Sequence, residues 1–309
     1  MLFAIGIRCI AVANGVMAAP DTGEPFFDLC LGWLQKVQMV SVAAGFLLLA
    51  AEAYIWNRFI NSQTLLNQTS NLPALFYILL LSLRPIQIGF YPALVASFFL
   101  ILAITRLSES SFKEKALSES FDAGFFTGMA TLFYFPSSVF LIFLWVSLLL
   151  LRSVVWREMV VSLIGFTIPA LLTLACYNIL FRGDNLYIPY RMFRTIWEYR
   201  FPLHYSWKHT LLTAVLGITG LVTIIFFVRG IANNVVKKRK IWSLMLWFST
   251  FGLAAGIIAP HKDAGAFSSL AIPCSFIFSN YFLKSKSRWL PDLLFILLAL
   301  SAGINIALG

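Results

Sequence analysis

The sequence contains little charge. Only 12% of its 309 residues are Asp, Glu, Lys or Arg, whereas 60% are hydrophobic. Soluble domains contain roughly 25% charged residues and about 45–50% apolar ones, so this shortage excludes an ordinary soluble domain. No polar stretch is long enough to form a separate soluble domain. We therefore expect a single integral membrane domain over residues 1–309, an all-α polytopic transmembrane bundle whose charges lie mainly in loops.

Metal ligands and paired cysteines are scarce as well. The four cysteines include no C-x-x-C motif, which argues against a disulfide framework and against a zinc site. The three histidines, His204, His209 and His261, are too few for an iron centre built from several histidines. The net charge of +10 would suggest nucleic acid in a soluble protein. Here the basic residues fall between apolar segments, so we expect membrane lipid, and no nucleic acid, as partner.

The apolar residues are grouped into segments of helical length. About eleven such segments can be distinguished, some shorter than the roughly 20 residues that a free-standing span needs. They are residues 2–19, 38–57, 72–84, 88–106, 121–134, 136–151, 159–181, 209–228, 241–259, 265–283 and 291–308. The first ends in "GVMAAP", which resembles a cleavage site, but Arg8 interrupts it and no basic region precedes it. We therefore expect an uncleaved first helix.

The basic residues between these segments predict one orientation. "VKKRK" at 236–240 is the strongest basic run and marks a cytoplasmic loop. "KSKSR" at 284–288 follows two helices later, on the same side, and the other basic loops agree. The N-terminus is then cytoplasmic and the C-terminus outside. The predicted outer segments are residues 20–37, 84–87, the turn near 135, 182–208 and 260–264.

The first outer loop is acidic. It reads "PDTGEPFFDLCLGWLQK" and contains Asp21, Glu24 and Asp28. These carboxylates are either solvated loop residues or functional ones. A carboxylate just beyond the first membrane helix can act as general base toward an acceptor hydroxyl, or bind a metal that neutralises a leaving phosphate.

The long outer segment 182–208 is basic and aromatic. Its arginines, including Arg191, Arg194 and Arg200, alternate with tyrosines and tryptophans. This pattern predicts an interfacial amphipathic segment, with the aromatic rings in the headgroup region and the arginines on phosphates.

A charged triplet, His261, Lys262 and Asp263, separates two apolar segments. It is either a solvated turn or the lining of a cavity. In the second case Lys262 or His261 contacts a phosphate and Asp263 orients one of them.

Glu52 lies within an apolar segment, between "LLLAA" and "AYIW". We expect this side chain to reach the inner interface or to pair with Arg58, rather than to be buried.

Two G-x-x-x-G spacings, Gly124/Gly128 and Gly252/Gly256, place two glycines on one helix face. We expect them to allow close packing within the bundle, with dimerisation as the alternative.

The layout of these charged outer segments resembles the GT-C superfamily of glycosyltransferases, which use polyprenyl-phosphate-linked sugars. The resemblance implies an essential carboxylate at Asp21, Glu24 or Asp28. One mannosyltransferase branch has an outer-loop His-Lys-Glu motif followed by Arg-Phe and prolines. The stretch "HKDAGAFSSLAIP" is similar to it at His261, Lys262, Phe267 and Pro273, but has Asp263 in place of Glu and lacks the Arg.

Most of the chain also resembles a family of uncharacterised bacterial multi-pass proteins. The shared stretches are "PDTGEPFFDLCLGW", "NLPALFYILLLSL", "GMATLFYFP" and "SNYF". The second resemblance carries no activity, whereas the first implies a GT-C-like transferase acting on a lipid-linked sugar at the outer face of a bacterial inner membrane. The alternative is a non-enzymatic subunit of an envelope assembly or secretion machine. A transporter is a third possibility, although the inverted repeat of many transporters is absent.

Overall fold

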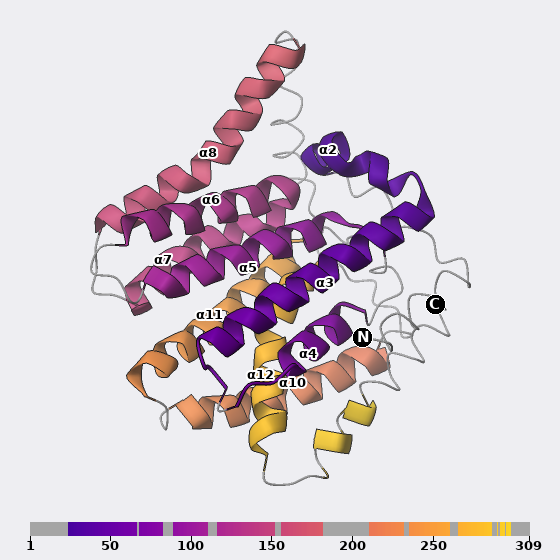
Figure 1. Ribbon diagram of the computed structural model, residues 1–309, viewed down its shortest axis with the longest axis vertical. Helices are drawn as coiled ribbons and strands as arrows, with labels where there is room; N and C mark the ends of the chain where they lie inside the picture. Colours follow the sequence, from indigo (N-terminus) through magenta and orange to yellow (C-terminus); the bar gives the residue numbers. More distant parts are fainter. Residues whose placement is uncertain are drawn as a thin grey trace.

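The computed structural model describes residues 24–66, 68–82, 89–110, 116–151, 156–181, 210–231, 235–259 and 265–285, and a few residues between 289 and 297. Every regular element in these ranges is a helix, and none is a strand (Figure 1). The expected all-α class is therefore confirmed for this part of the chain.

The helices follow the apolar segments of the sequence. The α-helices are α2 Pro25–Gln35, α3 Gln38–Ser62, α4 Leu72–Leu81, α5 Pro92–Ser110, α6 Leu117–Phe133, α7 Phe140–Leu151, α8 Trp156–Phe181, α10 Thr210–Ile231, α11 Val236–Ile258 and α12 Ala271–Lys284. Two 3-10 helices, η2 Phe135–Val139 and η4 Ser268–Leu270, precede α7 and α12. Each segment expected between residues 38 and 283 coincides with one of these helices to within a few residues at either end.

Two stretches expected to be loops are helical instead. Residues 25–35 form α2, which begins at Pro25, where the ring fixes the first helical φ and the missing N–H is not needed. The basic run 236–240 forms the first turns of α11. Lys and Arg are good helix formers, and their long side chains let the charges extend beyond the apolar part of the helix.

Among the described residues, four helices are long and apolar enough to cross a membrane. They comprise Met39–Ser62, Pro92–Ser110, Trp156–Cys176 and Lys238–Ile258. Shorter apolar helices pack against them. One is α4, which contacts both α3 and α12 and buries Phe76 and Tyr77 completely. A helix of this length is stable in the bundle because its neighbours surround it.

Glycines bring α6 and α8 into close contact. A Cβ on any of three glycines in these helices would collide with a backbone carbonyl of the other helix. The pairs are Gly124 with Ser162, Gly128 with Phe166, and Gly165 with Phe121. Only a glycine allows the two backbones to approach this closely.

The second glycine pair packs within the chain too. A Cβ on Gly252 would meet Leu270 at 3.0 Å, and one on Gly256 would collide with the ring of Phe267. Both G-x-x-x-G spacings therefore serve packing inside the bundle, as expected.

This contact yields a stability prediction. Gly124→Ala should destabilise the protein by about 1–3 kcal/mol, because the added methyl group overpacks the α6–α8 interface. Gly217→Ala is the matched control, since a Cβ there has no atom within 4 Å. The control should leave stability unchanged or raise it by up to about 1 kcal/mol. Thermal unfolding in detergent measures both, and equal effects would contradict the packing argument.

Candidate functional site

Glu24 is held at one end of the bundle, directly before α2. Its side chain is buried, with 3% exposed. Its Oε1 accepts a hydrogen bond of 3.3 Å from the backbone N–H of Phe135. Phe135 begins η2, just after α6 ends at Phe133, so its N–H lies at a helix start and needs a partner from elsewhere. The carboxyl group supplies this partner and links the first loop to the break between α6 and η2.

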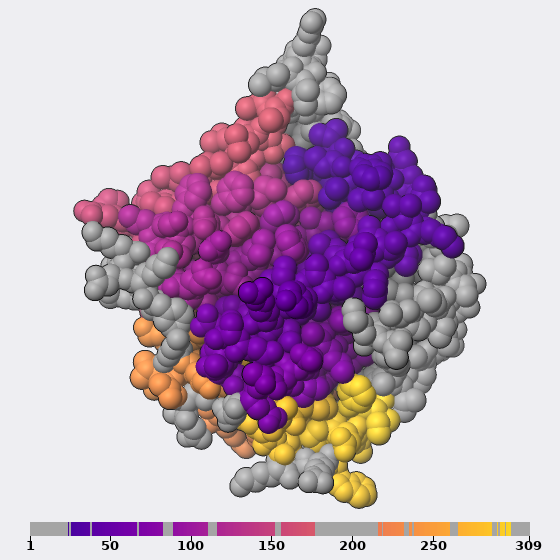
Figure 2. All heavy atoms as spheres, viewed as in Figure 1, coloured from indigo at the N-terminus to yellow at the C-terminus, as the bar shows by residue number. Residues whose placement is uncertain are grey.

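The apolar face of α2 fixes the position of Glu24. Phe27 is fully buried and stacks on Phe90, with ring centroids 5.6 Å apart. Phe26 meets Phe133 edge-on at 5.0 Å. At the other end of α2, Gln35 Nε2 donates to the Phe90 carbonyl at 2.9 Å. Figure 2 shows α2 and the first turns of α3, in indigo, on the surface at this end of the molecule.

Asp28 lies one helical turn after Glu24. Its backbone N–H donates to the Glu24 carbonyl at 3.0 Å, which begins the helical pattern of α2. The side chain of Asp28 is half-buried. Glu24 is therefore the N-cap residue of α2, and Asp28 lies in its first turn.

The segment after the charged triplet reaches the same end of the bundle. A Cβ on Gly265 would lie 2.5 Å from Ala93 Cβ and 2.9 Å from the ring of Tyr91. The Tyr91 hydroxyl also shares a hydrogen bond of 3.2 Å with Ser268. Residues 90–91 therefore contact α2 on one side and the segment from Gly265 on the other.

The remaining candidate site residues lie outside the described part of the chain. They are Asp21, Arg191, Arg194, Arg200, His261, Lys262 and Asp263. Of the candidate site residues, the structure describes the surroundings of Glu24 and Asp28.

Glu52 differs from its expected placement. It is completely buried, and the Tyr77 hydroxyl donates to its Oε2 at 2.8 Å. The expectation that Glu52 reaches the interface or pairs with Arg58 is therefore wrong. The physical reason is that α3 turns this face toward α4, while Arg58 is exposed. The second oxygen, Oε1, is buried without a hydrogen bond of good geometry in the described residues.

A second polar contact continues along the same face of α3. Trp56 follows Glu52 by one turn, and its Nε1 donates to the Ser275 hydroxyl of α12 at 2.9 Å. In the sequence, this buried polar face is indicated by Glu52 alone, an acidic residue within an apolar run. Acidic residues inside a membrane segment usually face the protein interior and often have a function.

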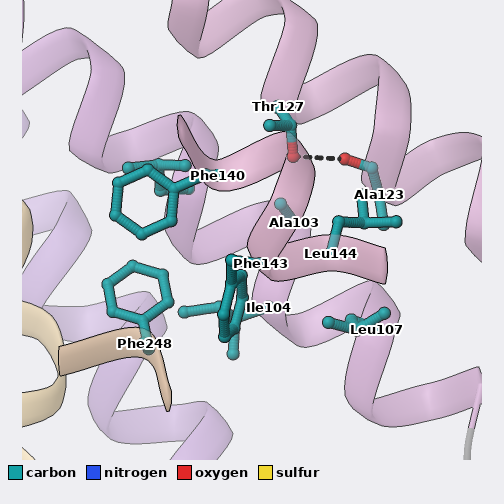
Figure 3. A pocket seen from close by; sticks show the side chains of 10 residues that line it. Ala103, Ile104, Leu107, Ala123, Thr127, Phe140, Phe143, Leu144 and Phe248 are labelled. Atoms are coloured by element: carbon teal, nitrogen blue, oxygen red, sulfur yellow. Dashed lines mark hydrogen bonds between the residues drawn. The ribbon is translucent and has the colours of Figure 1, made fainter. Parts of the chain in front are cut away.

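The described residues contain no group of three or more His, Cys, Asp or Glu side chains that could hold a metal ion. A cavity lies between α5, α6, α7 and α11 (Figure 3). Its lining is apolar apart from Thr127, whose hydroxyl donates to the Ala123 carbonyl at 2.8 Å. Apart from this hydroxyl, whose proton is already donated to Ala123, the cavity offers no polar group for a sugar or a phosphate.

In the part of the chain that the structure describes, the fold is all-helical, and four of its helices are long and apolar enough to cross a membrane. The chain belongs to a family of unknown function, DUF6427, whose model matches residues 29–302. The match begins directly after Asp28. No curated protein and no solved structure matches the chain. Membership of a family without an assigned activity is thus confirmed, and the likeness to GT-C enzymes stays a prediction.

The Glu52–Tyr77 pair yields a second stability prediction. Tyr77→Phe should destabilise the protein by about 1–3 kcal/mol, because the buried carboxyl group loses its donor. Tyr54→Phe is the matched control, since Tyr54 is 66% exposed. A double variant, Glu52→Met with Tyr77→Phe, should be more stable than Tyr77→Phe alone, because no polar group is then left unpaired. The midpoints of thermal unfolding in detergent measure these differences. A double variant less stable than Tyr77→Phe alone would refute this interpretation.

Proposed function

We propose that the chain is a membrane-embedded transferase of the GT-C type. It acts on a lipid-linked sugar at the outer face of a bacterial inner membrane. The observation that carries the proposal is the position of Glu24. It lies at the end of the bundle where residues 90–91 contact both α2 and the segment from Gly265. A carboxylate of the first loop and the flank of the charged triplet therefore belong to one region.

The surroundings of Glu24 suit a carboxylate that takes up a proton. The Phe135 amide fixes the orientation of the carboxyl group, and the aromatic packing of α2 restricts its movement. A base held in one geometry removes a proton from an acceptor hydroxyl more effectively than a mobile one. Asp21 and Asp28 supply further carboxylates in the same loop.

In this proposal the basic residues of the outer face hold the lipid phosphate. His261 and Lys262 contact it, and Asp263 orients them. Arg191, Arg194 and Arg200 bind the same phosphate or its neighbours. Hydrogen bonds between such cations and phosphate oxygens are roughly twice as strong as those between neutral groups.

The alternative, a non-enzymatic membrane subunit, has support from α8. Leu171 and Leu172 are 60% and 56% exposed, and the second half of α8 stands clear of the other labelled helices (Figure 1). In this alternative that half of α8 packs against another membrane protein. The experiments below distinguish the two functions.

The catalytic prediction rests on Glu24→Gln. Glutamine keeps an oxygen that can accept from the Phe135 amide, so α2 should stay in place, whereas the proton-accepting carboxylate is lost. Transfer from lipid extract to an acceptor should fall by about 10²–10⁴-fold, with normal expression and membrane insertion. Lys262→Ala should also abolish transfer. If both variants fully complement a deletion strain, the transferase proposal fails and the subunit alternative is favoured.

The proposed topology can be examined by labelling. With the N-terminus cytoplasmic and the C-terminus outside, single cysteines at positions 195 and 309 should react with an impermeant reagent on intact cells. A cysteine at position 238 should react only after the cells are opened. The native cysteines are replaced by serine beforehand. Labelling at position 238 in intact cells would overturn this orientation.

A further inference from the structure

Three helices meet around Trp242. The fully buried indole of this α11 residue stacks on Phe227 of α10, with centroids 4.3 Å apart. Phe276 of α12 meets it edge-on at 5.9 Å. A Cβ on Gly230, near the end of α10, would lie 3.5 Å from the ring. The end of α10 and the start of α11 are thus joined to α12 through one aromatic side chain.

Lysines of two helices converge beside this indole. The Nζ of Lys284, the last residue of α12, lies over the Trp242 ring at 4.5 Å from its centroid. Lys238 of α11 lies one turn before Trp242. Burial lowers the pKa of Lys284, and the charge of nearby Lys238 lowers it further. Residues four apart share a helix face, so Lys238 lies on the side of α11 that carries Trp242 and, over its ring, Lys284.

In the part of the chain that the structure describes, no carboxylate forms an ion pair with these cations. The sequence contains no Asp or Glu from Thr210 to Ala259, nor from 264 to 285. Arg229 and Arg239 add two more exposed cations at the ends of α10 and α11. Lys240 differs from them, because its Nζ donates to the Leu151 carbonyl at 2.6 Å and so binds the end of α7. The two ion pairs within the described residues join Arg106 to Glu109 and to Asp122, and neither involves α10, α11 or α12.

We propose that Lys238 and Lys284 bind the phosphate of an anionic phospholipid where α10, α11 and α12 meet, with Lys284 lying between the headgroup and the buried Trp242 ring. Two like charges held together without a carboxylate are stabilised by a ligand of opposite charge. Phosphate oxygens accept from both ammonium groups at once. Basic sites between membrane helices bind anionic headgroups in this way.

The surface of α10 argues for a lipid rather than for free phosphate. Leu221, Ile225 and Val228 are 64%, 52% and 49% exposed. Their spacing of four and three residues places them in one stripe along the helix. The stripe ends next to Arg229, at the same end as the lysines. An acyl chain can therefore lie along α10 while its phosphate reaches Lys238 and Lys284.

Binding of lipid to the detergent-purified protein tests the proposal. Native mass spectrometry gives the Kd for phosphatidylglycerol and for phosphatidylcholine with the same acyl chains. The unmodified chain should prefer phosphatidylglycerol. In the double variant Lys238→Gln with Lys284→Gln, the Kd for phosphatidylglycerol should rise about 30-fold, since each lysine removed costs about one charge's attraction to the headgroup. The Kd for phosphatidylcholine should stay unchanged.

The matched control is Arg58→Gln with Arg157→Gln, which removes the same charge from two exposed positions. Its Kd for phosphatidylglycerol should change by no more than about fivefold. Lys238→Arg with Lys284→Arg should keep the preference, because both charges remain. Equal losses in the glutamine variant and the control would overturn the proposal, as would equal affinity of the unmodified chain for both lipids.

Two measurements on the unmodified protein cover the case in which the glutamine variant does not fold. Raising the salt concentration from about 0.05 M to about 0.5 M should weaken binding of phosphatidylglycerol and not of phosphatidylcholine. Inorganic phosphate should compete poorly with the long-chain lipid. Salt-insensitive binding would refute the role of the lysines. Complete displacement by inorganic phosphate at equal concentration would refute a lipid as ligand.

Discussion

In an apolar environment every polar group must find its partner within the protein, and the arrangement of the described helices follows from this constraint. Several charged side chains satisfy it at breaks between helices, where backbone groups lack intrahelical partners. Glu24 accepts from the N–H of Phe135, Glu158 accepts from the N–H of Ala116 at 3.3 Å, and Lys240 donates to the carbonyl of Leu151. Each bond joins helices that are separated in sequence. The few charges therefore determine which helix ends lie together, while the apolar surfaces between them are less selective.

Some buried polar atoms in the described residues have no hydrogen bond of good geometry, and two of them lie at positions of interest. Glu52 keeps one carboxylate oxygen without a hydrogen bond of good geometry in the described residues, and the indole N–H of Trp242 lacks an acceptor there. One lies within the core between α3 and α4, and the other at the end of the bundle where α10, α11 and α12 meet. Such groups persist when they serve a purpose other than stability. The Trp242 indole supports Lys284, one of the two lysines for which we propose an anionic ligand.

The sequence predicts the helices of this fold well, and the candidate site only in part. Apolar runs of helical length locate each helix from α3 to α12, because little else can occupy a membrane. The sequence does not predict the helix α2, because its acidic and proline-containing start is typical of a loop. The helix is held in place by the packing of Phe27 on Phe90, which only the fold reveals. The burial of Glu52 is missed because α3 is apolar on all sides, so no periodicity marks the face that packs on α4. Its partner Tyr77 is 25 residues away, and only the fold brings them together.

The bond between Glu24 and Phe135 also affects how the protein is made. Its two ends are 111 residues apart. At a synthesis rate of about 5–20 residues per second, roughly 6–22 s pass between the emergence of the two residues. During this interval Phe90 becomes available to Phe27, but Glu24 lacks its Phe135 partner because η2 does not yet exist. The bond between the first loop and η2 is therefore completed only after α3, α4, α5 and α6 have been synthesised.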